Sequence, residues 1–470
     1  MRVSTERGWN TWYNKNTMAH VKLPEGIMYG WGLMNVDNVE IVTDAHVRCD
    51  GMVQLGLHSP NSGRYTEIKK FTWNGVQVKV ESATYGVDQL LIVVTPLTPI
   101  PSNIKLVIYN DFLYGREGTL SPDGLSIQGI GGEKFNIYVN NQLTKREPPF
   151  THPYMYQPHS YVPFASSGPM ILSTSPINET QAIQYLKDQR NTEQSHVDAN
   201  GGELYEPLYT IMNWNTIYHP LEGIFTPVSR GWDFGHGYVL FDWDTYFAAM
   251  MSSLFNKQVA YSNLLRITQS AVVEGFIPNY ASGTHKTRDR TEPPIGSLAT
   301  NYLYKIFKED WLLELVYDPL VKWNEWLYRA RCSDANGLCK WGTNVQKPTA
   351  DDWSGTKYGS QLESGMDNSP MFEHIAYDRV NQTMHLYDVG LNALVLSDTI
   401  ELIQMGITLK RNTSLLEKRR DGLWKRINDG LWDQEAGMYS NKKSDDGTFY
   451  RRPSPSNFYP LVDQGIGERR

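Results

Sequence analysis

Residues 1–176 alternate between apolar and polar positions with a period of two and are rich in β-branched and aromatic side chains. This alternation is typical of strands, because successive side chains of a strand point to opposite faces. Clusters of Gly, Asn, Pro and Ser, such as residues 59–63, separate the runs. The pattern predicts antiparallel sheets packed as a β-sandwich. Strands are expected at residues 39–47, 52–57, 67–80, 90–95, 104–109 and 169–174.

The pattern changes after residue 176. A polar helical stretch at 179–197 leads into Asn200-Gly201-Gly202, and residues 177–204 are interpreted as a helical linker. Beyond it, apolar residues recur every three or four positions, which predicts a domain of amphipathic helices over residues 205–470. Functional residues are expected in its long connecting loops. The helices are expected at residues 244–255, 259–273, 296–307, 310–331, 383–405 and 414–432, with a shorter one after Asp367.

Composition narrows the classes of partner. The length of 470 residues favours more than one domain, and the 14 Trp and 28 Tyr suit either carbohydrate binding or a large aromatic core. The net charge of -7 and the absence of a dense Lys/Arg stripe argue against nucleic acid as a partner. No apolar run approaches the roughly 20 residues that span a bilayer, so no membrane partner is expected.

Three cysteines, Cys49, Cys332 and Cys339, are an odd number, and only the last two could close a short loop. A disulfide framework is therefore not expected, and a reducing compartment is the default. The N-terminus lacks the apolar segment of a secretory signal, so a cytoplasmic location is expected. The His and Cys spacing shows no zinc pattern, and neither a metal nor an organic cofactor is expected.

The first motif whose side chains could bind a ligand is FDWDTYF at residues 241–247, at the expected start of a helix. Asp244 is there a natural N-cap, whose carboxylate would bind free backbone amides. The functional alternative is that Trp243 stacks on a sugar ring while Asp244 accepts hydrogen bonds from two adjacent hydroxyls.

Two further motifs follow. The loop at 276–294 carries Asn279 and Arg290, which supply donors for hydroxyl groups, although Arg290 could instead pair with Glu292 or Asp289. Residues 362–372 read LESGMDNSPMF. Gly365 permits torsions that other residues resist, so Asp367 can be held at a sharp bend pointing into a cavity. The alternative is that this motif serves only as a helix cap.

In this order, the motifs resemble the inverting glycosidases of glycoside hydrolase family 63, which includes processing α-glucosidase I and mannosylglycerate hydrolase, and the related family 37 trehalases. The shared pattern is WDxYF, then PN, then R followed closely by PP, then ESGxD. This chain matches it at residues 243–247, at 278–279, at Arg290 with 293–294, and at 363–367. The resemblance covers roughly residues 230–375.

The resemblance implies an (α/α)6 barrel behind the β-sandwich and an exo-acting enzyme for an oligosaccharide or small glycoside. It implies that Asp367 is the general acid that protonates the glycosidic oxygen. It further implies that the subsite for the non-reducing sugar is lined by Trp243, Asp244, Asn279, Arg290 and Gly365.

One part of the family pattern is missing. An inverting enzyme needs a second carboxylate as general base, about 6.5–9.5 Å from the acid. In the families that this chain resembles, the base is a Glu well downstream of ESGxD, and no residue here matches its motif. Seven expected helices against the twelve of a complete barrel likewise predict a barrel that is incomplete at its C-terminal end. Glu373 and Glu401 could substitute by residue type, but they are expected in ion pairs or on solvated faces.

The substrate expected is an α-glucoside or an α-mannoside. Trehalases carry an Arg seven residues before the Trp of WDxYF, where this chain has His236, so trehalose is disfavoured. A catalytically inactive carbohydrate-binding protein stays open as the alternative. A sugar epimerase of the (α/α)6 class would use paired histidines, and only His285 and His374 lie near the motifs.

Overall fold

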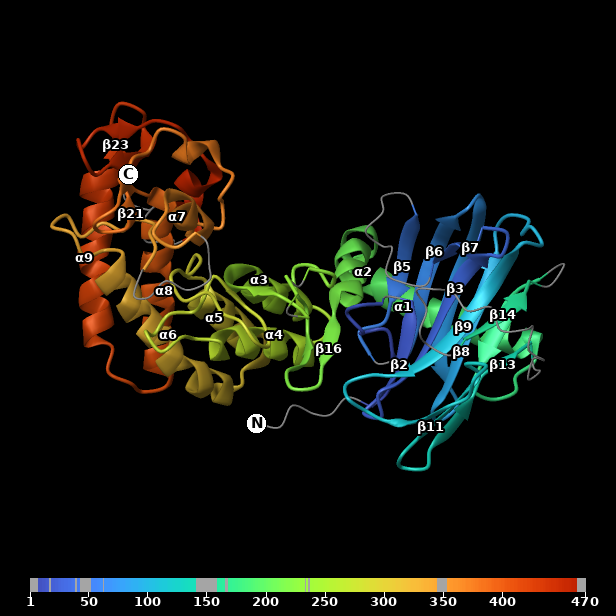
Figure 1. Cartoon of the computed structure of the whole chain (residues 1–470). Coiled ribbons are helices and arrows are strands. Elements are labelled where there is room, and N and C mark those ends of the chain that lie inside the picture. Colours follow the sequence, from blue (N-terminus) through green and yellow to red (C-terminus); the bar gives the residue numbers. More distant parts are fainter. Residues whose placement is uncertain are drawn as a thin grey trace. The chain divides into compact units, whose positions relative to one another are not determined.

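A computed structural model describes residues 7–16, 18–38, 40–42, 52–61, 63–140, 159–164, 168–232, 234–235, 237–344 and 353–462. The chain divides into two compact units, Met1–Gly231 and Trp232–Arg470. Strands dominate the first unit and helices the second (Figure 1). The predicted boundaries at residues 176 and 204 stay predictions, and the segment after them up to Gly231 packs within the first unit.

Two six-stranded antiparallel sheets form most of the first unit. One sheet has the order β1 (Gly8–Asn10), β2 (Ala19–Leu23), β3 (Ile27–Asn35), β9 (Ile104–Phe112), β14 (His159–Pro163), with β4 (Glu40–Val42) also paired to β3. The other has the order β13 (Tyr138–Val139), β15 (Met170–Ser173), β8 (Gln89–Pro96), β7 (Val76–Tyr85), β6 (Thr66–Trp73), β5 (Val53–His58). A smaller sheet contains β10 (Gly118–Leu120), β11 (Ser126–Gly129) and β12 (Lys134–Asn136).

The two large sheets share one hydrophobic core. Trp31 of β3 packs edge-on against Phe71 of β6, with ring centroids 5.9 Å apart. Leu106 of β9 and Val94 of β8 belong to the same buried cluster. Alternate residues of both sheets therefore point inward, as the period-two pattern predicts for an antiparallel sandwich.

Two strand predictions need correction. Residues 67–80 do not form one strand, because the chain reverses at Asn74 and Gly75, whose φ angles are 46° and 77°. Asn-Gly is the preferred pair for a tight hairpin turn that needs positive φ at both positions. The strand expected at 39–47 ends at Val42, and the rest of that prediction lies outside the described residues.

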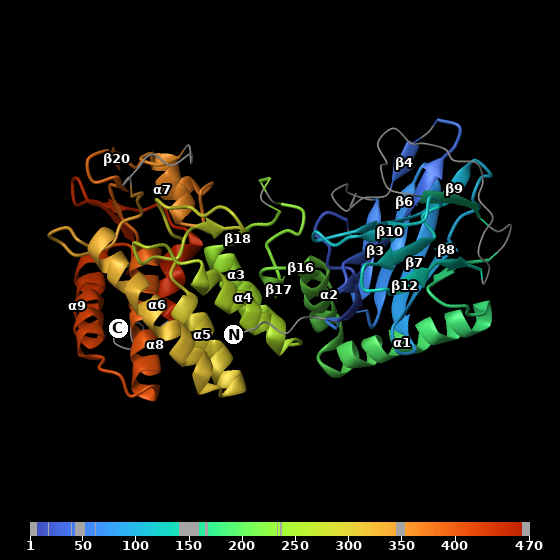
Figure 2. The ribbon, with the colours of Figure 1, turned by 60° about the horizontal axis from the view of Figure 1, so that its bottom comes forward.

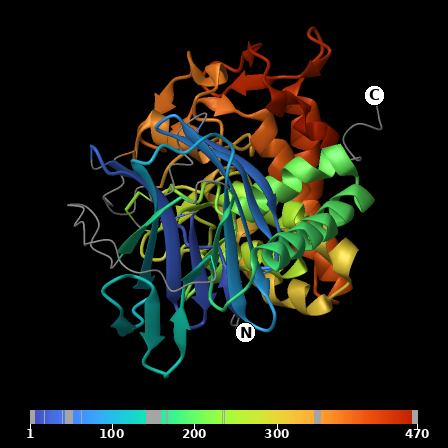
Figure 3. The ribbon, with the colours of Figure 1, turned by 90° about the vertical axis from the view of Figure 1, so that its right-hand side faces the viewer.

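Helix α1 (Glu179–Ala199) confirms the helix predicted at 179–197 and lies along the sheet that contains β7 (Figures 2 and 3). Tyr185 of α1 donates a hydrogen bond to the Thr84 carbonyl of β7 over 2.7 Å. A second helix, α2 (Tyr205–Asn215), was not expected. Trp214 anchors it by donating to the Gly56 carbonyl over 2.9 Å. The turn η2 (Gly202–Leu204) joins the helices, and β16 (Ile217–His219) and β17 (Gly223–Phe225) form the next hairpin.

The described part of the second unit contains seven α-helices. They are α3 (Asp242–Ser252), α4 (Lys257–Gln269), α5 (Gly296–Phe307), α6 (Asp310–Ala330), α7 (Lys357–Glu363), α8 (Val389–Thr408) and α9 (Ser414–Leu431). All of them except α7 bury apolar residues at helical spacing, and α8 and α9 run side by side (Figure 1). Short antiparallel strands lie before, between and after these helices: β18 (Leu240–Phe241), β19 (Tyr280–Ala281), β20 (Tyr377–Asp378), β21 (Thr383–Met384), β22 (Leu386–Tyr387), β23 (Trp432–Asp433), β24 (Met438–Tyr439), β25 (Asn441–Lys443) and β26 (Phe449–Tyr450). The turn η4 (Pro455–Val462) follows.

Two helix predictions also change. The short α-helix expected after Asp367 is instead a single 3-10 turn, η3 (Pro370–Phe372), and α7 precedes Asp367. The helix expected from residue 383 begins only at Val389, because Asp388 caps it by accepting a hydrogen bond from the Leu391 amide over 2.8 Å. Among the described residues, no helix combines the length and apolar character needed to cross a membrane.

Cys332 and Cys339, the pair that the sequence named as able to close a short loop, form a disulfide, although no disulfide framework was expected. A turn between them brings the two residues together. Asp334 accepts a hydrogen bond from the Gly337 amide over 3.0 Å, and Gly337 has a φ of 61°. The disulfide joins the end of α6 to the segment at 340–344, which contributes to the site described below.

We expect the double variant Cys332→Ser/Cys339→Ser to lose about 2.5 kcal/mol of stability, because the open loop gains conformational entropy on unfolding. Urea unfolding followed by tryptophan fluorescence measures the loss. The wild type in dithiothreitol should match the variant, and the variant should not respond to the reductant. Denatured wild type should titrate one thiol before reduction and three after it. Three thiols before reduction would contradict the assignment.

Candidate active site

The first motif lies at the start of α3. Phe241 is the N-cap, with an extended backbone and no side-chain cap hydrogen bond. The expectation that Asp244 caps this helix is therefore wrong, because Asp244 is its third residue. Asp244 is half-buried, and burial raises the pKa of its carboxyl. Trp243, also half-buried, precedes it.

The second motif is tied to the first by backbone hydrogen bonds. Phe241 of β18 pairs with Tyr280 of β19. The Asp242 amide donates to the Asn279 carbonyl, and the Asn279 amide donates to the Arg290 carbonyl, both over 3.0 Å. Residues almost 50 positions apart in the sequence thus lie in one small network.

Asn279 uses its side chain inside this network. Its amide donates to Glu292 over 2.6 Å, and only 3% of the residue is exposed. The other oxygen of Glu292 accepts from the Trp243 amide over 3.2 Å, while the Glu292 amide donates to Asp242 over 3.3 Å. Each carboxyl of this pair therefore accepts a hydrogen bond from a backbone amide in the segment that carries the other. Together they fix the backbone at Trp243.

Both carboxyls of this pair are buried, and the sequence did not identify either as a site residue. Burial raises the pKa of Asp242 and of Glu292 well above their usual values, and neighbouring carboxyls add to both shifts. Oδ1 of Asp242 is buried and accepts no hydrogen bond from the described residues. An oxygen in that position suits a protonated carboxyl. Glu292 was considered only as an ion-pair partner for Arg290.

Arg290 pairs with its neighbour Asp289. The guanidinium donates to both carboxylate oxygens over 3.1 and 3.0 Å, and both side chains are almost fully buried. The ion pair that the sequence offered as the alternative role for Arg290 is thus observed with Asp289.

Glu363, the first residue of the third motif, is completely buried and accepts four hydrogen bonds. Arg331 supplies two of them, over 2.7 Å each. The amides of Gly342 and Thr291 supply the others, over 2.7 and 3.2 Å. This carboxylate therefore joins α7 to the end of α6, to the segment at 340–344 and to the loop that carries Arg290.

Gly365 brings the third motif against the first. Its φ is +66°, and a Cβ atom at this position would lie 2.5 Å from Cζ2 and 2.6 Å from Cε2 of Trp243. Asp367 follows two residues later and is half-buried, with the Tyr358 hydroxyl 3.5 Å from its Oδ2. The predicted residues Trp243, Asn279, Arg290 and Gly365 thus belong to one connected region, and Asp244 and Asp367 adjoin it along the chain.

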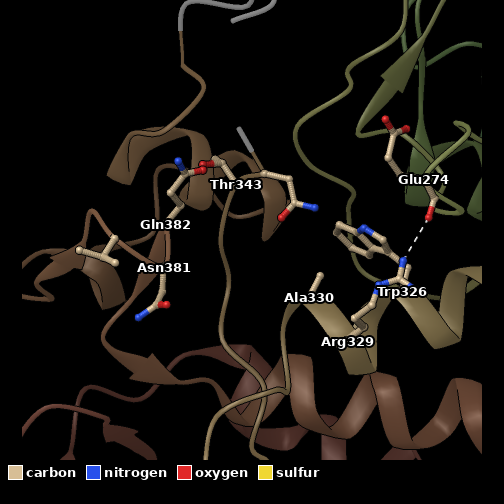
Figure 4. Close-up of a pocket in the computed structure, with 9 residues that line it drawn as sticks. Glu274, Trp326, Arg329, Ala330, Thr343, Asn381 and Gln382 are labelled. Atoms are coloured by element: carbon tan, nitrogen blue, oxygen red, sulfur yellow. Dashed lines mark hydrogen bonds between the residues drawn. The ribbon is translucent and has the colours of Figure 1, made fainter. Parts of the chain in front are cut away.

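Figure 4 shows a separate cavity of about 470 Å³. None of the six predicted residues lines it. Trp326 in its wall lies under the Arg331 guanidinium, 4.6 Å from ring centroid to Cζ, and Arg329 donates to the Glu274 carbonyl over 3.3 Å. The cavity lining is Glu274, Trp326, Arg329, Ala330, Thr343, Asn344, Val380, Asn381 and Gln382.

The described residues contain no cluster of three His, Cys, Asp or Glu side chains that could hold a metal ion. His285 stacks on Tyr280, and His374 lies 3.8 Å from Glu373. His236, the residue that bears on trehalose, lies outside the described residues.

Comparison with known families identifies the class of this protein. Residues 237–470 match a model of a glycoside hydrolase domain, and this part of the chain is such a domain. The family is that of the mannosylglycerate hydrolase MGH1-like glycoside hydrolases, to which the segment belongs. The family relationship inferred from the three motifs is confirmed.

Solved structures with similarity to the chain are distant. A family 63 mannosylglycerate hydrolase from Thermus thermophilus, solved with glucose, is 19% identical with a TM-score of 0.39, over 47% of this chain and 64% of that one. An uncharacterized conserved protein from the same organism is 19% identical with a TM-score of 0.40, over 50% and 67%. A neutral trehalase from Saccharomyces cerevisiae is 16% identical with a TM-score of 0.41, over 52% and 54%. The chain thus spans about two thirds or less of these proteins. No curated protein matches it.

Substitution of Gly365 by Ala tests the contact with Trp243. We expect a loss of about 2–4 kcal/mol, from the unfavourable left-handed backbone and from forced displacement of the indole ring. Gly437→Ala is the matched control, because Gly437 has a φ of +65° but nothing within 4 Å of its Cβ position. Urea unfolding of both variants gives the difference. Equal losses would show that the ring and the glycine do not pack as described.

The raised pKa of Asp242 predicts a pH dependence of stability. A carboxyl whose pKa is higher in the folded state binds more protons there, so stability is highest below its ordinary pKa of 3.8 and falls as the pH rises towards the folded value. Asp242→Asn cannot ionise and should flatten this decline by up to about 1.4 kcal/mol per pH unit, the slope for one proton. Urea unfolding between pH 4 and 8 measures the slope. The exposed Asp421→Asn is the control, and equal slopes in both variants would contradict the prediction.

Proposed function

We propose that residues 237–470 act as an exo-acting, inverting glycosidase on an α-glucoside or an α-mannoside. The observation that supports this most is the contact between Gly365 and Trp243, because it joins the WDxYF and ESGxD motifs across more than 100 residues of sequence. A half-buried indole, the Asp244 carboxylate and the loop carrying Asp367 then border the same small region.

In this proposal, the face of Trp243 stacks on the non-reducing sugar and Asp244 accepts hydrogen bonds from its hydroxyls. Asp367 donates a proton to the glycosidic oxygen as the bond to the anomeric carbon breaks. Arg290 and Asn279 take the role of holding the site, since their side chains bind Asp289 and Glu292. Gly365 leaves room for the indole.

Water must attack from the opposite face of the sugar, with a second carboxylate taking its proton. The two residues that could be this base by residue type, Glu373 and Glu401, bind other side chains. Glu373 is exposed and pairs with Arg452 over 2.5 Å, and Glu401 accepts from Asn301 over 2.6 Å. We assign the base to neither. This gap keeps sugar binding without turnover as the second candidate function.

The finer points of fold and location also remain proposals. We propose that α3 to α9 belong to an (α/α)6 barrel, following a β-sandwich domain at 1–176 and a linker at 177–204. We also propose a cytoplasmic location, against which the Cys332–Cys339 disulfide counts, because disulfides are typical of oxidising compartments.

Hydrolysis of α-glucosides and α-mannosides, with the anomer of the released sugar followed by NMR, tests the proposed function. We expect release with inverted configuration, and a drop in kcat of at least about 100-fold in Asp367→Asn because the leaving oxygen is no longer protonated. Asp318→Asn, at an exposed position on α6, is the control and should keep full activity. Sugar binding without any release would favour the second candidate, and unchanged activity in Asp367→Asn would reject Asp367 as the acid.

A further inference from the structure

Four aromatic side chains form a cluster that includes Phe241 of the first motif and Tyr280 of the second. Trp232 lies 5.2 Å from both Phe234 and Phe241, measured between ring centroids. Tyr280 lies 5.8 Å from Phe234 and 5.9 Å from Phe241. The four rings therefore form a closed circuit of neighbours, which we call the aromatic platform.

The aromatic platform faces solvent. Trp232 is 45% exposed and Phe234 is 52% exposed, while Phe241 and Tyr280 are half-buried. The aliphatic neighbour Leu240 is buried. A contiguous exposed patch of aromatic rings is unfavourable in water and is typical of a binding surface.

The chain holds the platform in a defined geometry. Phe241 and Tyr280 are opposite residues of the β18/β19 pair, and His285 stacks on Tyr280 with centroids 5.6 Å apart. Phe234 has a φ of +45°, a conformation that is rare for a bulky side chain. Backbone strain of this kind is concentrated at ligand-binding sites, where the surrounding structure enforces it.

The platform is continuous with the proposed sugar subsite. Phe241 precedes Trp243 by two residues, and Tyr280 directly follows Asn279. Because consecutive Cα atoms are about 3.8 Å apart, the platform begins within about 8 Å of the Trp243 backbone. A substrate held at Trp243 and Asp244 could extend over it.

We propose that Trp232, Phe234, Phe241 and Tyr280 bind the sugar units of an oligosaccharide on the leaving-group side of the cleaved bond. This deepens the proposed function and rests on it for the position of that bond. Flat ring faces stack on the C–H faces of sugars, and an indole N–H such as that of Trp232 can donate to sugar hydroxyl groups. The platform therefore selects oligosaccharides over glycosides with a small leaving group.

Kinetics on substrates of different length test this. The short substrates are α-glucosyl fluoride and α-mannosyl fluoride, which carry one sugar and a leaving group too small to reach the platform. The long substrates are maltotriose, maltotetraose and an α-linked mannotriose. In Phe234→Ala and in Trp232→Ala we expect KM for the hydrolysed long substrate to rise roughly 3- to 10-fold, the loss of one aromatic stacking contact. Kinetics on the fluorides should not change.

The matched control is Phe458→Ala, which removes a ring that is 60% exposed outside the platform. It should leave the kinetics on all substrates unchanged. Thermal unfolding of the three variants checks that they fold equally well, as expected for exposed positions. Equal effects on fluorides and oligosaccharides, or no effect on either, would overturn the platform as an oligosaccharide site.

If the protein releases no sugar, calorimetric binding of the same oligosaccharides separates the two proposals. Binding by the wild type that weakens in Phe234→Ala but not in Phe458→Ala would support the platform while the proposed hydrolysis fails. Binding that is absent, or equal in both variants, would overturn the platform.

Light scattering provides the remaining test. A wild-type dimer that becomes a monomer in Phe234→Ala, with sugar binding unchanged, would identify the patch as a contact between protein copies and overturn the proposal.

Discussion

The arrangement of the site depends on the buried ion pair between Arg331 and Glu363. Burying two charges is unfavourable unless geometry and hydrogen bonding compensate for the lost hydration. Here Arg331 donates to both oxygens of Glu363, and the amides of Gly342 and Thr291 complete its hydrogen bonds. Four chain segments meet at this carboxylate. Gly365 and Asp367 come shortly after Glu363 in the chain. Their positions are therefore set by buried residues that lie outside the proposed sugar subsite.

A second group of buried polar contacts lies at the start of α3. Asp242, Glu292 and Asn279 hold the backbone on either side of Trp243, and Arg290 is neutralised by Asp289. The motif residues thus divide into two groups. Asn279, Arg290 and Glu363 position loops, whereas Trp243, Asp244 and Asp367 keep part of their surface in solvent. A short family motif records both groups without distinguishing them.

The sequence predicted well what depends on neighbours along the chain. Helix α5 has the predicted bounds, since its apolar spacing is a local property. Errors arose where one local pattern hid another. The Asn74-Gly75 turn lies inside a run of alternating apolar and polar residues, so the run was read as one strand. The helix start was placed at Asp244, although the extended backbone of Phe241 makes Phe241 the N-cap. The contact between Trp243 and Gly365 joins distant segments, so the motifs could suggest it only through the family resemblance. The roles of Arg331, Asp242 and Glu292 had no local pattern, because they arise from tertiary contacts alone.

The close approach of Gly365 to the indole of Trp243 also limits how this region can change. A larger residue at 365 requires a smaller one at 243, but a smaller residue at 243 removes the flat surface beside Asp244. The two positions are therefore coupled through this contact, and the left-handed backbone at 365 further restricts a replacement there to residues that tolerate positive φ, such as Asn or Asp. Variants at 365 should therefore be made together with smaller residues at 243, since a search that changes one residue at a time would leave the new side chain against the indole ring.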